Sequence, residues 1–233
     1  MVYIGIATYD GKLHWSTTAG LVQAAQWCAK NQVGFCVDVI PGDAFIDKAR
    51  NLLAHRFLKS GFHDLVYIDA DIGFDIAGIG ALCKAEPEVV MGLYRMKCPD
   101  PVRYPALLLD PIERHPSDQS LVRLQYGPAG FMRVRREVFE AIRAKWPDEY
   151  YVNAGAETIH DYFGCGRYGN HFQGEDMKFC ERVSQVGFKI WAVQNVKLRH
   201  YGEKCYDSDW AIDVLQIDEA RHGNIKMAEA EAA

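Results

Sequence analysis

Residues Leu65–Asp71 read Leu-Val-Tyr-Ile-Asp-Ala-Asp, an apolar run that ends in two carboxylates one residue apart. The run predicts a buried β-strand. In open α/β sheets, ligands bind beyond the carboxyl ends of the strands, which is where Asp69 and Asp71 would lie. Paired carboxylates suit Mg²⁺ or Mn²⁺ better than Zn²⁺, and such ions hold diphosphates through their oxygens. The stretch therefore predicts a metal and diphosphate site at a sheet edge.

The first ninety residues alternate strands with helices. Strands are expected at about 2–8, Phe35–Ile40, Leu65–Ile68 and Val89–Gly92. Between them, helices are expected at Thr17–Asn31, Asp43–Ser60 and Ala77–Ala85, the first with Thr17 or Thr18 as its N-cap. This order is typical of a parallel sheet with right-handed crossovers, and so of an α/β fold.

The second half is less regular. Strand-like stretches at Ala106–Leu109, Leu121–Gln125 and Phe131–Val134 precede a helix at Arg136–Lys145. A helix opening at Glu175 and strands at Lys189–Val193 and Val196–His200 follow. The glycine-rich segment Gly164–Gly174 lies just before that helix, and we expect it to form a mobile lid over a ligand.

Composition limits the classes of function. The chain has 233 residues, enough for one sizeable core, and its 49% hydrophobic and 24% charged content is ordinary for a globular enzyme. A formal net charge of −5 argues against a protein built to coat nucleic acid or an anionic membrane. No apolar run approaches the roughly 18 residues that a membrane helix needs.

Seven cysteines are spread along the chain without C-x-x-C spacing. An odd number without paired spacing predicts free thiols in a reducing compartment rather than a disulfide framework or a zinc site. The N-terminus begins directly with a strand and shows no basic leader, so we expect no signal peptide. These features together predict a cytoplasmic protein with no membrane span.

The order of several short motifs resembles that of the GT-A class of nucleotide-sugar glycosyltransferases, especially the small stand-alone enzymes of bacteria and their viruses. The likeness runs from Ile4 to about Tyr201. The motifs that carry it are Ala7-Thr8-Tyr9, Ile46-Asp47-Lys48-Ala49-Arg50-Asn51, Tyr67-Ile68-Asp69-Ala70-Asp71, Gly127-Pro128-Ala129-Gly130-Phe131, Gly174-Glu175-Asp176 and the late His200.

The resemblance implies a single GT-A, Rossmann-like domain, with a mostly parallel central sheet flanked by helices and a smaller acceptor-side β portion. It implies a nucleotide-sugar-binding half at 1–95 and an acceptor-binding and catalytic half at 96–205. Residues 206–233 would form a C-terminal helix and a frayed tail. The activity implied is metal-dependent transfer of a sugar from a nucleotide-diphosphate sugar, with UDP favoured, to a hydroxyl acceptor.

The resemblance also assigns site residues. Asp69, Asp71 and His200 would bind Mn²⁺ or Mg²⁺, with Asp69 near the ribose or the metal. A lone strand-end histidine such as His200 is more commonly hydrogen-bonded locally. Asp176 would be the catalytic base and Glu175 a neighbour that binds sugar or acceptor, although acidic residues in the first turn of a helix also stabilise its dipole.

The remaining assignments concern the donor. The expected contacts with the nucleotide sugar are made by Thr8, Tyr9, Asp43, Arg50, Asn51, Asp69 and Gly130. Family members often carry a base-binding carboxylate just after the second strand, and Asp43 is the nearest candidate here. Arg50 could bind a phosphate through two parallel hydrogen bonds, or it could pair with a carboxylate. Gly130 could admit a sugar or could simply form a turn.

Three alternatives remain at this point. A non-catalytic nucleotide-sugar binding module is the weakest, because it would not need both Asp176 and a metal site. The acceptor, otherwise a glycan or small molecule, could be a hydroxymethylated base in phage DNA, contacted by a basic face. That face would be formed by Arg133, Arg135, Arg136, Lys197 and Arg199. A sugar nucleotidyltransferase would also use an Asp pair and a metal, but it should carry a Gly-rich basic loop after the first strand. Asp10-Gly11-Lys12 is a poor version of such a loop.

Overall fold

The computed structural model describes residues 1–153 and 155–215. Its centre is an eight-stranded sheet. From one edge to the other the strands are β2 (Phe35–Pro41), β1 (Val2–Thr8), β3 (Asp64–Ile68), β8 (Phe131–Arg135), β5 (Val89–Met91), β13 (Ile190–Val193), β7 (Leu121–Tyr126) and β6 (Leu107–Leu108). Within this sheet β8 and β7 run opposite to the others, so six of the eight strands share one direction.

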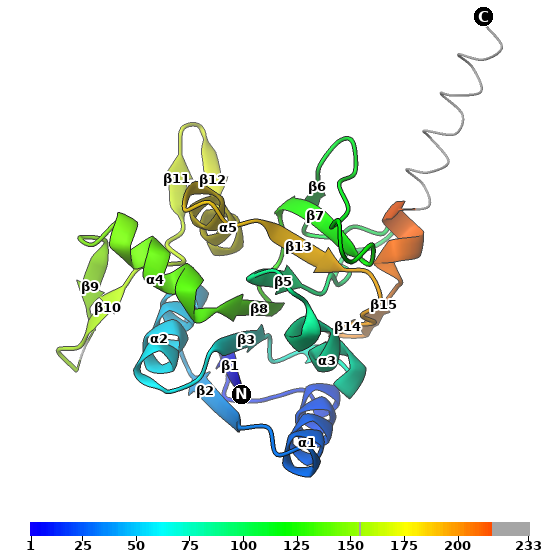
Figure 1. Ribbon diagram of the computed structural model, residues 1–233, viewed down its shortest axis with the longest axis horizontal. Helices are drawn as coiled ribbons and strands as arrows, with labels where there is room; N and C mark the ends of the chain where they lie inside the picture. Colours follow the sequence, from blue (N-terminus) through cyan, green and yellow to red (C-terminus); the bar gives the residue numbers. More distant parts are fainter. Residues whose placement is uncertain (154, 216–233) are drawn as a thin grey trace, which may run out of the picture.

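Helices cover both faces of the sheet (Figure 1). On one side lie α2 (Ile46–Lys59), α4 (Arg136–Lys145) and α5 (Glu175–Gln185), and on the other lie α1 (Trp15–Lys30) and α3 (Ile76–Lys84). Successive side chains of a strand point to opposite faces of the sheet, so the central strands contribute to two separate hydrophobic cores. In β3, Leu65 and Tyr67 pack with α2 and α4, whereas Val66 and Ile68 pack on the α3 side.

Short strands complete the fold. β4 (Ile72–Gly73), β14 (Arg199–Tyr201) and β15 (Cys205–Asp207) form a small sheet next to the end of β3. β9 (Tyr150–Val152) pairs with β10 (Thr158–His160), and β11 (Gly166–Tyr168) pairs with β12 (His171–Gln173). A short π-helical segment, η1 (Ala211–Leu215), ends the described chain. No helix within these residues is long and apolar enough to cross a bilayer.

Three expectations need correction. The simple parallel series fails at β5, because the antiparallel strand β8 inserts between β3 and β5. The last predicted strand begins at Arg199 rather than at Val196. Helix α1 begins earlier than predicted, with His14 as its N-cap, and Thr17 is buried within the helix. Most of the predicted C-terminal segment 206–233, including its frayed end, lies outside the described residues.

Candidate active site

The turn Asp69–Asp71 is held by backbone and side-chain bonds from both sides. It follows β3, and its Ala70 carbonyl accepts hydrogen bonds from the backbone N–H of His14 at 2.8 Å and the hydroxyl of Thr17 at 3.1 Å. On the other side, the N–H of Tyr201 in β14 donates to the Asp71 carbonyl at 2.9 Å. The buried Thr17 therefore fixes this turn instead of capping its helix, and the two carboxylates project from rigid elements.

Strand pairing brings His200 to the same turn. His200 in β14 lies opposite Ile72 in β4, which places its Nε2 3.6 Å from Asp71 Oδ1. Its Nδ1 lies 2.9 Å from the carbonyl oxygen of Arg95, and a carbonyl can only accept, so Nδ1 carries the proton. Burial lowers the pKa of His200 and favours the neutral ring. The free lone pair on Nε2 faces Asp71, an orientation typical of metal-binding histidines.

Asp69 and Asp71 face different partners. Asp71 contacts the ammonium of Lys97 as well as His200, whereas Asp69 accepts from Arg50 at 3.0 Å and from the Tyr94 hydroxyl at 3.5 Å. Within 1–153 and 155–215, no group of three or more His, Cys, Asp or Glu side chains is arranged to hold a metal ion. The arrangement therefore offers a two-residue set, Asp71 and His200, with a cation already placed beside Asp71.

Gly130 makes room for Asp69. The Gly130 carbonyl accepts from the Asp69 N–H at 2.9 Å, and a Cβ at Gly130 would lie 2.3 Å from both Asp69 Oδ2 and the Tyr94 hydroxyl. The glycine is thus required because Asp69, just after β3, and Tyr94, after β5, closely approach the residue that precedes β8.

Gly130→Ala should therefore destabilise the protein by about 1–3 kcal/mol and weaken donor binding, because it displaces the Asp69 carboxylate. Gly80→Ala in α3 is the matched control, since a Cβ there meets nothing within 4 Å. That control should raise stability by about 0.5–1 kcal/mol through helix propensity. Chemical denaturation of the two variants measures both effects, and equal stability in Gly130→Ala and the parent protein would contradict the steric argument.

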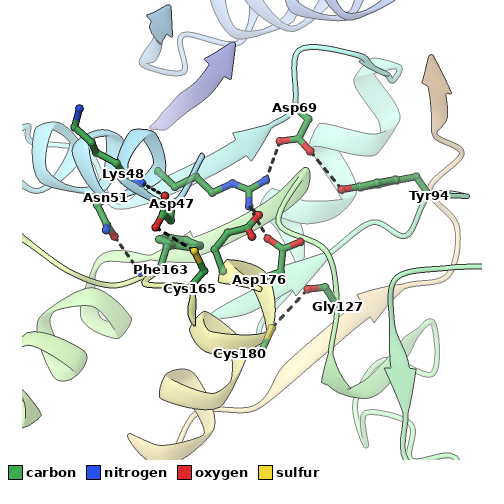
Figure 2. A network of polar contacts seen from close by, with 12 residues as sticks. Asp47, Lys48, Asn51, Asp69, Tyr94, Gly127, Phe163, Cys165, Asp176 and Cys180 are labelled. Atoms are coloured by element: carbon green, nitrogen blue, oxygen red, sulfur yellow. Dashed lines mark hydrogen bonds and ion pairs between the residues drawn. The ribbon is translucent and has the colours of Figure 1, made fainter. Parts of the chain in front are cut away.

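Arg50 joins the two acidic motifs. Its guanidinium is 3% exposed and lies 2.7 Å from Glu175 Oε1, 2.5 Å from Asp176 Oδ1 and 3.0 Å from Asp69 Oδ1. Figure 2 shows two of these carboxylates, those of Asp69 and Asp176, pointing into the same region. The Arg50 side chain therefore pairs with three carboxylates. Of the two partners that the sequence suggested, a phosphate or a carboxylate, the structure shows carboxylates.

The pKa of Asp176 is suited to proton transfer. Asp176 lies in the first turn of α5, after the N-cap Gly174. Burial raises the pKa of its carboxyl group to about 6, with Glu175 and Asp69 adding to the rise and Arg50 opposing it. A carboxylate with this pKa is ionised at neutral pH and is a stronger base than an ordinary aspartate.

An open cleft of about 560 Å³ lies against the Asp69–Asp71 turn. Its lining includes Asp69, Asp71 and His200 together with the end of β1, where Thr8 is buried and Tyr9 is 77% exposed. The Thr8 hydroxyl donates to the Lys12 carbonyl at 2.9 Å. The cleft therefore unites the predicted metal ligands with two of the predicted donor contacts.

Four predicted donor contacts lie outside the lining of this cleft, namely Arg50 and Gly130, described above, and Asp43 and Asn51. Asp43 pairs with Lys48 at 3.1 Å and accepts from the N–H of Phe45. Asn51 donates to Asp161 at 2.8 Å, and its oxygen accepts from the backbone N–H groups of Tyr162 and Phe163 at 2.8 and 3.0 Å. Asn51 therefore positions the chain that leads toward α5.

The predicted basic face is incomplete, because Arg133 and Arg136 bond backbone carbonyls instead of facing solvent. Arg133 is fully buried and donates to the carbonyls of Leu82, Ala85 and Glu88. Arg136 likewise donates to backbone carbonyls in the last turn of α2 and just after it. Short-range sequence clustering suggested a surface patch because it cannot show that residues Phe131–Val134 of β8 are buried on both faces of the sheet.

Several residues at the site were not predicted from the sequence. Lys97 contacts Asp71, Tyr94 contacts Asp69, and Asp161 contacts Asn51. Each of these three residues lies in a loop or at a strand end without a recognisable motif. The segment Gly164–Gly174, expected to be a lid, contains the β11–β12 hairpin, which projects beyond α5 in Figure 1. Its mobility stays a prediction.

Comparisons with known proteins identify similar folds. No protein-family model matches the sequence, and no curated protein matches it. The crystal structure of A197 from STIV is similar with a TM-score of 0.52, at 16% identity over 87% of this chain and 86% of that one. The chain has the mixed α/β fold that the resemblance to GT-A glycosyltransferases predicts.

Two other solved structures are similar over much of the chain. GalNAc-T7 with UDP, GalNAc and Mn²⁺ has a TM-score of 0.49 at 12% identity, over 86% of this chain and 44% of that one. Drosophila β1,4-galactosyltransferase 7 with manganese, UDP-Gal and xylobiose has a TM-score of 0.44 at 14% identity, over 84% and 66%. At these identities the similarity concerns the fold, and the chemistry has to be argued from the residues of this chain.

Proposed function

We propose that the protein is a glycosyltransferase that moves a sugar from a nucleotide-diphosphate sugar, with UDP favoured, to a hydroxyl acceptor. The observation that carries the proposal is the joining of two acidic motifs by one buried arginine. Asp69, Asp71 and His200 line an open cleft at the end of β3, and Arg50 connects Asp69 to Glu175 and Asp176. This arrangement supports a donor site next to a candidate base.

A divalent ion, Mn²⁺ or Mg²⁺, fits the residues at the cleft. Asp71 and His200 would hold it, since Nε2 of His200 is unprotonated and faces Asp71, and the Lys97 ammonium already occupies a cation position there. Asp69 would contribute through the ribose or through the metal. Sites of this kind bind Mg²⁺ through one or two carboxylates plus substrate phosphates. When bound, the ion supplies charge neutralisation for the diphosphate leaving group.

Asp176 supports an inverting transfer. The acceptor oxygen forms a bond to the anomeric carbon as the bond from that carbon to the diphosphate oxygen breaks. The hydroxyl proton passes to the Asp176 carboxylate. Arg50 holds Asp176 in place, since its Nη1 lies within 2.7 Å of the carboxylates of Glu175 and Asp176.

Asp71→Ala and His200→Ala should each weaken metal-dependent donor binding at least tenfold while the fold is retained. Calorimetry with a UDP sugar, with and without Mn²⁺, measures the effect. The matched control is His63→Ala, because His63 is exposed and precedes β3 at the end opposite Asp69.

A thermal-shift screen of nucleotide sugars with and without Mn²⁺ identifies the donor for these titrations. A ligand that binds only the native state stabilises it by about 2.7 kcal/mol at a hundredfold excess over its dissociation constant. Full metal-dependent affinity in both the Asp71 and the His200 variant would show that the metal site is misassigned.

A further inference from the structure

A second hollow of about 310 Å³ lies beside the cleft. It is bounded by the start of α2, by β9 and by the chain that precedes β11. Its lining consists of Phe45, Asp47, Lys48, Asn51, Tyr151, Asp161, Gly164 and Cys165.

The hollow and the cleft meet at the start of α2. Ile46 lines the cleft, while its neighbours Phe45 and Asp47 line the hollow. Asp47 and Arg50 are three residues apart and so share one helix face. Asp47 accepts from the Cys165 thiol at 3.4 Å, and Arg50 holds Glu175 and Asp176. Figure 2 shows Asp47 and Cys165 on the side of Asp176 away from Tyr94. Arg50, which holds the candidate base, thus shares a helix face with a residue that lines the hollow.

The charge of the hollow selects against anionic ligands. Asp47 and Asp161 contribute two carboxylates, and the single cation, Lys48, is paired with Asp43 at 3.1 Å. Burial, together with Asp161, Asp47 and Asp43, raises the pKa of Tyr151 to about 12, so its hydroxyl stays a neutral donor. A lining of this kind repels phosphate groups, whereas a nucleic-acid site needs an excess of cations.

The hollow also offers an aromatic surface. The Phe45 ring is 66% exposed and lies at its edge, and Tyr151 lies within it. Large exposed aromatic rings beside a polar hollow are typical of ligand-binding surfaces. The combination of flat apolar rings with carboxylate, amide and hydroxyl groups matches a sugar, which presents an apolar ring face and hydroxyl donors.

We propose that this hollow binds the acceptor and that the acceptor is an uncharged carbohydrate. The inference rests on the proposed glycosyl transfer. It gives each space one substrate, with the donor diphosphate in the cleft and the acceptor sugar in the hollow. Asp176, held by Arg50 on the Asp47 face of α2, would take the proton of the acceptor hydroxyl.

The test uses the full chain with Mn²⁺ and the UDP sugar chosen by thermal shift. UDP release and product formation are measured without acceptor, with a panel of neutral p-nitrophenyl glycosides, and with a hydroxymethylcytosine oligonucleotide. We expect at least one neutral glycoside to be glycosylated. Its KM should change less than twofold between about 50 and 300 mM salt, because no phosphate contacts are made.

Phe45→Ala is the variant that probes the hollow. It should raise the KM for the glycoside at least tenfold while the donor dissociation constant stays within twofold of the parent value. Tyr150→Ala is the matched control, because Tyr150 is also an exposed aromatic residue and does not line the hollow. That control should leave both constants unchanged.

The outcomes separate the two proposals. If no nucleotide sugar binds in the presence of metal, glycosyl transfer itself is wrong. If donor binds but only the oligonucleotide is glycosylated, or if Phe45→Ala leaves the KM for the glycoside unchanged, the assignment of the hollow is overturned and the proposed transferase activity stands.

Discussion

Asp176→Asn should lower turnover by about 10²–10⁴, the usual share of general base catalysis, while donor affinity stays within about twofold. The asparagine oxygen can still accept from Arg50, so the geometry around Asp176 is preserved. The amide cannot take a proton from the acceptor hydroxyl. Initial-rate measurements with saturating donor give the effect on turnover, and calorimetry gives the donor affinity.

The same variant should be more stable than the parent protein at pH 7–8. The pKa of Asp176 is raised to about 6 in the folded state, above its ordinary value of 3.8, so the folded protein binds this proton more tightly than the unfolded chain. The contribution of Asp176 to the free energy of unfolding is therefore present at low pH and is lost as the pH rises through about 6. Removing the ionised carboxylate should gain about 1–2 kcal/mol at pH 8 and nothing near pH 4.

The pH profile gives a third readout of the same group. For the parent protein, kcat/KM should fall about tenfold per pH unit below about pH 6, as Asp176 becomes protonated. Glu181→Gln on the same helix is the control. Glu181 contacts Gln173 and Lys178 and is not one of the carboxylates that pair with Arg50. Near-normal turnover in Asp176→Asn would return Asp176 to a structural role at the start of α5 or indicate a retaining mechanism.

Local patterns were sufficient for the elements that carry the site. Apolar runs predicted β1, β3 and β13 because buried strands have a strong local signature, and α4 was predicted with its observed bounds, Arg136–Lys145. The carboxylates Asp69 and Asp71 were placed at the end of a strand because the apolar run stops there. The short hairpin strands β9 and β10 were missed, since three mixed residues each give no usable periodicity.

Long-range contacts could not be predicted in the same way. Nothing near β8 indicates that it inserts between β3 and β5, because strand order depends on contacts across the whole chain. The partners of Arg50 lie 19 to 126 residues away along the sequence. For that reason a phosphate contact and a carboxylate contact had equal support from sequence, and only the fold distinguishes them.

Arg50→Met should be the most destabilising single substitution at the site. It would leave Asp69, Glu175 and Asp176 close together without their shared cation, and removing one partner of a buried ion pair costs about 3–5 kcal/mol. These carboxylates keep 22–28% side-chain exposure, so solvent moderates the cost and we expect about 3 kcal/mol in urea unfolding.

Arg50→Lys separates the charge of Arg50 from its geometry. A lysine keeps the positive charge, so most of the lost stability should return, but a point ammonium cannot hold three carboxylates in a fixed fork. Turnover should therefore stay at least tenfold below the parent value, because Asp176 is no longer oriented toward the acceptor. Arg56→Met on the exposed face of α2 is the matched control and should cost less than about 1 kcal/mol, since its pair with Asp38 is partly solvated. A lysine variant with full turnover would mean that Arg50 contributes charge alone and that the spacing between donor and base is set by the backbone.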